Sequence, residues 1–260
     1  RIPYGESDYE AIRTENSYYV DKTGYLSEIE KACKYLFFIR PRRFGKTLFL
    51  SMMETYYDIA KKDRFDFFYQ GTAIHKNPTA ERNSYLILKF NFSLISPEPD
   101  KVEESFITYI LDTADLFISK FHHLLGIDVK ETAAELKSRK TASDILRSLI
   151  SLCKKSERKL YVIIDEYDNF ANTILSSAGS RDYKKITRGE GFFRTFFNVL
   201  KGGTSGSGAP ISRLFVTGVS PITLDDVTSG FNIGENISID AAFNRMLGFT
   251  RDDVQGILDY

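Results

Sequence analysis

Residue types that bind phosphate gather in one short segment, Arg40-Pro41-Arg42-Arg43-Phe44-Gly45-Lys46-Thr47. An apolar run over 35–39 precedes this segment, and a helical pattern over 48–59 follows it. A strand, a loop and a helix in this order leave free backbone N–H groups at the start of the helix, where they face an anion. In such a loop the lysine reaches the β- and γ-phosphates, and the threonine hydroxyl contacts Mg²⁺. We therefore expect a bound nucleotide to lie against Arg42, Arg43, Phe44, Gly45, Lys46, Thr47 and Leu48.

A second segment carries two adjacent acids. The apolar run 160–164 is followed at once by Asp165 and Glu166. Strands buried on both faces have such apolar runs, and acids at their carboxyl ends lie at the sheet edge where ligands of open α/β folds bind. We expect Asp165 to hold Mg²⁺ through water, together with Thr47. Glu166 is expected to polarise an attacking water, so Glu166 and Lys46 are the predicted catalytic residues.

Composition excludes several classes of protein. Lys+Arg and Asp+Glu are equal, at 35 each, so net charge does not support a nucleic-acid partner. The two cysteines, Cys33 and Cys153, form neither a metal-ligand spacing nor a disulfide framework, which favours a cytoplasmic location. No apolar run approaches the ~18 residues of a membrane helix, so no membrane association is expected.

Strands alternate with helices along the chain, which predicts an α/β fold with a mainly parallel sheet covered on both faces. The expected strands are 35–40, 84–93, 160–164, 211–217 and a short one at 237–239. We expect an N-terminal helical segment over 1–34, in which Thr23 caps a helix from Gly24 to Lys34, and a core over 35–248. The polar segment 176–189 is expected to be an exposed loop, and 229–237 is expected to be loop-like. Residues 249–260 are expected to start a further helical region, capped by Thr250 and cut short, in a piece of a longer protein.

Four motifs together resemble those of the bacterial AAA-ATPase-like family. They are Tyr19-Val20-Asp21-Lys22-Thr23, the segment 40–47, Asp165-Glu166-Tyr167-Asp168 and Thr217-Gly218-Val219-Ser220-Pro221. The resemblance implies a P-loop NTPase three-layer sandwich of the AAA/ASCE type, with ATP and Mg²⁺ as cofactors and with its lid absent or truncated. Arg40 stands where the usual phosphate loop has glycine, and this is normal for the family. Many members carry a C-terminal nuclease-like domain of the PD-(D/E)xK type, which we expect as an attached domain in the full-length protein.

The expected function is an ATPase module that couples nucleotide state to a conformational change in an attached domain or partner. The alternatives are a non-hydrolysing nucleotide-dependent switch, the ATPase half of a nucleic-acid-processing protein, and a small-molecule phosphotransferase. A GTPase is disfavoured because the chain has no Asn-Lys-x-Asp run to bind guanine. The sequence does not predict the oligomeric state.

Some residues have two interpretations at this stage. The resemblance makes Thr217 and Ser220 candidate γ-phosphate sensors, although a threonine at a strand end or a serine in a turn is also ordinary. Asp168 either supports the acid site or caps the next helix. Arg42 and Arg43 contact phosphates or form surface ion pairs, and Asp21-Lys22 belongs to the pocket or forms an ion pair at a helix start. Three arginines are candidate arginine fingers: Arg188, Arg194 and Arg245.

Overall fold

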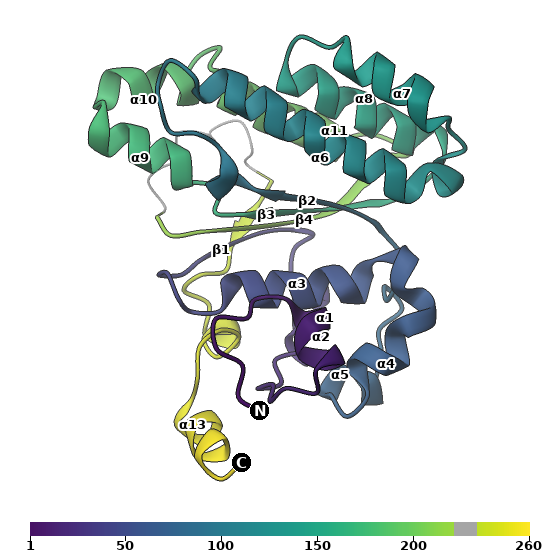
Figure 1. The fold of residues 1–260 in the computed structure, drawn as a ribbon, viewed down its shortest axis with the longest axis vertical. Coiled ribbons are helices and arrows are strands. Elements are labelled where there is room, and N and C mark those ends of the chain that lie inside the picture. The colour runs from purple at the N-terminus through teal and green to yellow at the C-terminus, as the bar shows by residue number, and fades with distance from the viewer. Residues whose placement is uncertain (221–232) are drawn as a thin grey trace.

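The centre of the protein is a sheet in which all strand pairs are parallel, seen in a computed structural model that describes residues 1–220 and 233–260. The strand order is β2-β3-β4-β1-β5, which places β4 between β1 and β3. Figure 1 shows the sheet between two layers of helices. The predicted α/β three-layer sandwich is therefore confirmed. The strands are β1 (Tyr35–Ile39), β2 (Leu86–Asn91), β3 (Leu160–Asp165), β4 (Ile211–Gly218) and β5 (Glu235–Asn236).

Helices cover both faces of the sheet (Figure 1). One layer contains α1 (Tyr9–Thr14), α2 (Tyr25–Lys31), α3 (Lys46–Tyr57), α4 (Phe65–Tyr69) and α5 (Ala73–Lys76), with the short turn η1 (Ile59–Arg64). After β2 and the turn η2 (Phe92–Leu94), the other layer contains α6 (Val102–Leu125), α7 (Val129–Lys137), α8 (Ala142–Lys155), α9 (Asn169–Ser177), α10 (Ser180–Thr187) and α11 (Phe192–Gly203). The turn η3 (Ala241–Phe243) and α13 (Arg251–Leu258) follow β5.

The sheet separates two apolar cores because alternate residues of each strand point to opposite faces. In β2, Leu86, Leu88 and Phe90 pack into the core beneath α6, α8 and α11, whereas Ile87 packs into the core beneath α3. The aromatic side chains of α11 also belong to the core beneath α6, α8 and α11, since Phe193, Phe196 and Phe197 are fully buried. These two cores fix the strand ends that carry the candidate site.

Three local predictions were wrong. The segment 176–189 is largely helical, because α10 buries Tyr183 and Ile186 against the core. The last strand is Glu235–Asn236, two residues before the predicted 237–239, and residues 229–232 of the predicted loop lie outside the described residues. Thr23 does not cap α2. Its hydroxyl donates to Asp21 and accepts from the Ile74 N–H, so it holds the α2 entry against α5.

The C-terminal helix is capped as predicted. The Thr250 hydroxyl accepts from the Asp253 N–H at 3.1 Å, and the Asp253 carboxylate accepts from the Thr250 N–H at 2.7 Å. This reciprocal capping box fixes the start of α13. None of the described helices combines the length and the apolar character needed to cross a lipid bilayer.

Candidate functional site

The phosphate loop joins β1 to the start of α3. Arg43 and Gly45 both have left-handed backbone conformations, with φ of 67° and 85°. Gly45 is the N-cap of α3, and it makes no side-chain capping hydrogen bond because it has no side chain. The first N–H groups of this 12-residue helix are therefore left for another acceptor, which the positive end of the helix dipole also favours.

Lys46 is the first residue of α3 and is only 5% exposed. Its Nζ donates to the backbone carbonyls of Arg40 and Pro41, both at 2.9 Å. Burial lowers the pKa of the Lys46 amine, and the nearby carboxylates of Asp165 and Glu166 oppose this effect. The amine is thus held inside the loop and faces the two acids of the β3 end.

The Asp165 carboxylate binds residues that follow or end two other strands. Its carboxylate accepts from the Thr47 hydroxyl and from the Thr217 hydroxyl, each at 2.7 Å. Thr47 follows β1 through the phosphate loop, Asp165 ends β3, and Thr217 lies near the end of the intervening β4. The structure therefore brings the adjacent Lys46 and Thr47 close to Asp165, which lies more than a hundred positions later in the sequence.

Glu166 lies beside this cluster in a left-handed conformation, with φ of 50°. Such a conformation is unfavourable for a residue with a side chain and is found most often where surrounding contacts impose it. The Glu166 carboxylate accepts from the Asn169 side-chain amide at 2.7 Å. Sequence reasoning missed this contact because it depends on the turn between β3 and α9.

A cavity of about 910 Å³ connects these groups with both ends of the chain. One end is lined by the phosphate loop and Glu166, and the other end is mostly apolar. The apolar walls come from Tyr18–Val20 on the N-terminal side and from Leu247–Phe249 with Ile257 on the C-terminal side. The paired tyrosines before the phosphate loop were a sequence signal for this wall, but nothing in the sequence placed residues 247–257 opposite them.

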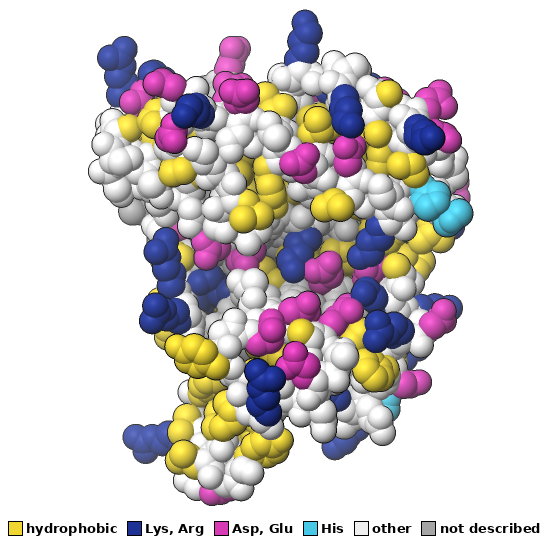
Figure 2. Space-filling view, viewed as in Figure 1, with side chains coloured by type: hydrophobic (Ala, Val, Ile, Leu, Met, Phe, Trp, Pro, Cys, Tyr) yellow, Lys and Arg dark blue, Asp and Glu magenta, His cyan; other side chains and the backbone are white. Residues whose placement is uncertain are grey.

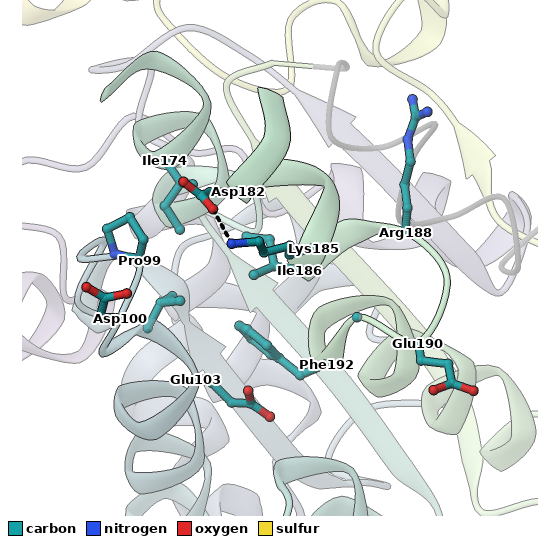
Figure 3. A pocket seen from close by; sticks show the side chains of 12 residues that line it. Pro99, Asp100, Glu103, Ile174, Asp182, Lys185, Ile186, Arg188, Glu190 and Phe192 are labelled. Carbon is teal, nitrogen blue, oxygen red and sulfur yellow. Dashed lines mark hydrogen bonds and ion pairs between the residues drawn. The ribbon is translucent and has the colours of Figure 1, made fainter. Parts of the chain in front are cut away.

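A smaller cavity, of about 440 Å³, lies between the start of α6 and the helices α9, α10 and α11 (Figure 3). Its rim carries the Asp182–Lys185 ion pair, at 2.6 Å, and the side chain of Arg188. None of the predicted nucleotide-binding, metal or catalytic residues lines it. The predicted nucleotide-binding residues and both predicted catalytic residues line the larger cavity instead.

The remaining predicted residues have these positions. Arg42 and Arg43 are exposed and line the larger cavity. Lys22 lines it too and pairs with Asp253 at 2.8 Å, so this lysine belongs both to the pocket wall and to an ion pair.

Asp168 makes no capping hydrogen bond to α9 and instead accepts from the backbone N–H groups of residues 219 and 220. Arg40 lies over the Phe38 ring, 4.4 Å from its centre, and donates to the Ser238 carbonyl.

The donor set fits a magnesium ion. Thr47 would supply one oxygen ligand and Asp165 would hold the ion through water, since Mg²⁺ usually takes its remaining ligands from water and phosphate oxygens. The Thr47 hydroxyl donates its hydrogen bond to Asp165, so its oxygen lone pairs stay available to a metal ion. Within residues 1–220 and 233–260 there is no group of three His, Cys, Asp or Glu residues that could hold a metal by itself.

Comparison with known proteins gives one family and one curated relative. The family model described as a predicted AAA-ATPase, AAA-ATPase-like, matches residues 3–228. The relative is an uncharacterized protein in the vnfD 5′ region of Azotobacter chroococcum mcd 1, 25% identical over 259 residues. The match covers 99% of this chain and 44% of the relative, so the chain spans less than half of that protein. No solved structure matches the chain significantly.

Proposed function

Because the chain belongs to the AAA-ATPase-like family, we propose that it is an ATP-binding, Mg²⁺-dependent ATPase module. Family membership supports nucleotide binding in general. The observation that carries the finer proposal is that Lys46, Thr47 and Glu166 line one cavity and that Asp165 is hydrogen-bonded to Thr47 beside it. That arrangement offers a cation, helix N–H groups, a metal site and a general base within one pocket.

In this proposal each residue has a distinct task. The Lys46 amine exchanges its two carbonyl acceptors for β- and γ-phosphate oxygens, and the first N–H groups of α3 bind the same phosphates. Thr47 and Asp165 hold Mg²⁺, which neutralises phosphate charge when bound. Glu166 orients a water for attack on the γ-phosphorus and accepts its proton, while the bond from that phosphorus to the β–γ bridging oxygen breaks. The apolar end of the cavity suits the adenine ring of the nucleotide.

The C-terminal segment offers a route for coupling. The Gly248 N–H donates to the carbonyl of Phe44, a residue of the phosphate loop, at 3.1 Å. The Lys22–Asp253 pair and the Tyr18–Tyr260 ring contact, with centroids 4.6 Å apart, hold α13 on the N-terminal segment. Figure 2 shows apolar side chains gathered at this lower end of the molecule, and Phe249 and Leu258 are among the exposed ones. We propose that nucleotide binding moves this segment and whatever domain or partner contacts it, including the nuclease-like domain that the family resemblance implies.

One observation favours a second candidate, a switch that binds nucleotide without turning it over. The Asn169 side-chain amide binds one carboxylate oxygen of Glu166 and restrains the proposed general base in one orientation, so hydrolysis requires that its other oxygen reach the attacking water. A partner protein would then control hydrolysis by releasing Glu166. The net charge of zero gives no support to the third candidate, a nucleic-acid-processing ATPase.

The test combines nucleotide-dependent thermal shifts with measured phosphate release. The parent chain should be stabilised by Mg²⁺-ATP, by about 2.7 kcal/mol at a hundredfold excess over Kd. Lys46→Ala should abolish the shift, whereas Lys62→Ala, at an exposed lysine of η1, should keep it. Glu166→Gln should keep the shift and reduce phosphate release by about 10²-fold or more.

Three outcomes distinguish the candidates. A parent chain that shows the thermal shift but releases no phosphate is the switch and not the ATPase. Release that rises with DNA and falls steeply with salt would favour the nucleic-acid-processing alternative. A Glu166→Gln variant that hydrolyses ATP at the parental rate contradicts the assigned base.

A further inference from the structure

Two loops at the carboxyl edge of the sheet are joined by one buried carboxylate. Asp168, which follows β3, is 1% exposed. It accepts from the backbone N–H groups of Val219 at 3.1 Å and Ser220 at 2.6 Å, which follow β4. The Asn172 side-chain amide donates to the same carboxylate at 2.8 Å. A buried carboxylate that accepts several N–H bonds is held in place by them, because each charge-assisted bond is stronger than one between neutral groups.

Further hydrogen bonds join the same two loops. The Tyr167 hydroxyl donates to the Ser220 carbonyl at 2.5 Å, and the Tyr167 N–H donates to the Thr217 carbonyl at 3.0 Å. At Gly218 a Cβ atom would meet the Tyr167 ring and would lie 2.6 Å from Asp168 Oδ1. The two loops therefore lie in close contact at Gly218, where a side chain would have no space.

We propose that Asp168 is a positioning residue, which fixes residues 217–220 relative to Glu166 at the γ-phosphate end of the pocket. The inference rests on the proposed ATPase function. Glu166, the proposed base, lies two residues before Asp168. Asp168 binds the N–H of Ser220, one candidate sensor, and the other, Thr217, lies two residues before the bound Val219. Asp168 holds residues 217–220 at a fixed distance from Glu166. If residues 217–220 contact the γ-phosphate, the same hydrogen bonds therefore also fix the distance between the γ-phosphorus and the water bound by Glu166.

Replacing Asp168 by asparagine tests this geometry with almost no change in volume. An amide has one acceptor oxygen, and its NH₂ group would face another donor among Val219, Ser220 and Asn172. Asp168→Asn should therefore speed amide hydrogen exchange at residues 219 and 220 at least about tenfold, since a hydrogen bond to a carboxylate is roughly twice as strong as one to a neutral amide. It should lower kcat at least about tenfold while KM for ATP stays within about threefold.

Asn172→Ala is the matched control because it removes one donor to Asp168 and leaves both backbone contacts in place. It should leave exchange at 219–220 and kcat within about threefold of the parent. Should Asp168→Asn fail to fold, Tyr167→Phe serves as the second variant, because it removes the hydrogen bond to the Ser220 carbonyl and should reduce kcat more than it changes KM.

The two proposals fail in different ways. A parent chain without hydrolysis rejects the ATPase, yet the exchange of residues 219 and 220 still reports on Asp168. Parental exchange in Asp168→Asn overturns the positioning role even if the parent hydrolyses ATP. An equal loss in Asn172→Ala, or a rise in KM equal to the fall in kcat, also overturns it, because either result indicates general destabilisation or lost binding.

Discussion

Gly218 is the residue at which the candidate site tolerates least change. It ends β4 between the Tyr167 ring and the Asp168 carboxylate, so a methyl group has no space on the side where a Cβ would point. Gly202 in α11 differs in every relevant respect, because it is exposed and helical, and no neighbouring atom lies within 4 Å of the place that a methyl group would take. Comparing alanine substitutions at these two positions therefore distinguishes the effect of crowding from the effect that a methyl group has on the backbone alone.

Gly218→Ala should destabilise the protein by about 1–3 kcal/mol, the usual cost of overpacking a tight contact. Gly202→Ala should stabilise it by up to about 1 kcal/mol, because alanine favours helix more than glycine does. Urea unfolding of both variants measures the free energies of unfolding. An unchanged free energy in Gly218→Ala would show that the two loops can separate at little cost.

At the residue scale, the sequence predicted which chemical groups meet but not how each is held. Lys46, Thr47 and Asp165 were predictable because their residue types and their places after apolar runs are typical of a phosphate loop and an acid-bearing strand. Thr217 was predicted only as a candidate, and its hydrogen bond to Asp165 places it in the same cluster. The contact between Glu166 and Asn169 was not predicted, since it depends on a left-handed turn that the local sequence does not specify.

Among the elements, α13 depends most on its few docking contacts. Asp253 caps the helix and pairs with Lys22, and its side chain is 21% exposed. Burial acts to raise the pKa of Asp253, but the hydrogen bonds from Lys22 and Thr250 outweigh burial and hold that pKa below its usual value. The folded protein thus binds the Asp253 proton less tightly than the unfolded chain does.

The lowered pKa of Asp253 in the folded protein predicts how stability depends on pH. The stabilisation from Asp253 is fully present above the pKa of an unfolded aspartate, about 4, and is lost as the pH falls through the lower folded value. The effect should be modest, about 0.5–1 kcal/mol, because the pair is partly solvated. Hydrogen-exchange protection of α13 should therefore decrease below about pH 4 in the parent, and Asp253→Asn should already show the lower protection at pH 7. Equal protection in both chains at pH 7 would mean that other contacts hold α13.

Helices and strands were predicted correctly where apolar residues recur with a clear period. They were missed or misplaced where apolar residues are few among polar ones. The long α6, Val102–Leu125, is readable from the sequence because its buried residues recur at helical spacing. The helix α10 was missed because Tyr183 and Ile186 are its large apolar anchors and lie among charged and small residues. Their spacing of three was the available signal. The position of β5 was off by two residues, since the two residues that pair with β1 are exposed and polar.

Across the whole molecule, the sheet order determines when the site can form during synthesis. The strand β1, which leads into the phosphate loop, ends at residue 39, but its partner β4 begins only at residue 211. At about 5–20 residues per second, a ribosome needs on the order of ten seconds or longer to make the intervening chain. A fragment ending at residue 209 should therefore lack a cooperative unfolding transition in calorimetry, because β1 would have neither β4 nor β5 beside it. The nascent chain must keep its earliest strand free of wrong partners until its latest strands emerge, so refolding should be slow and aggregation should compete with it.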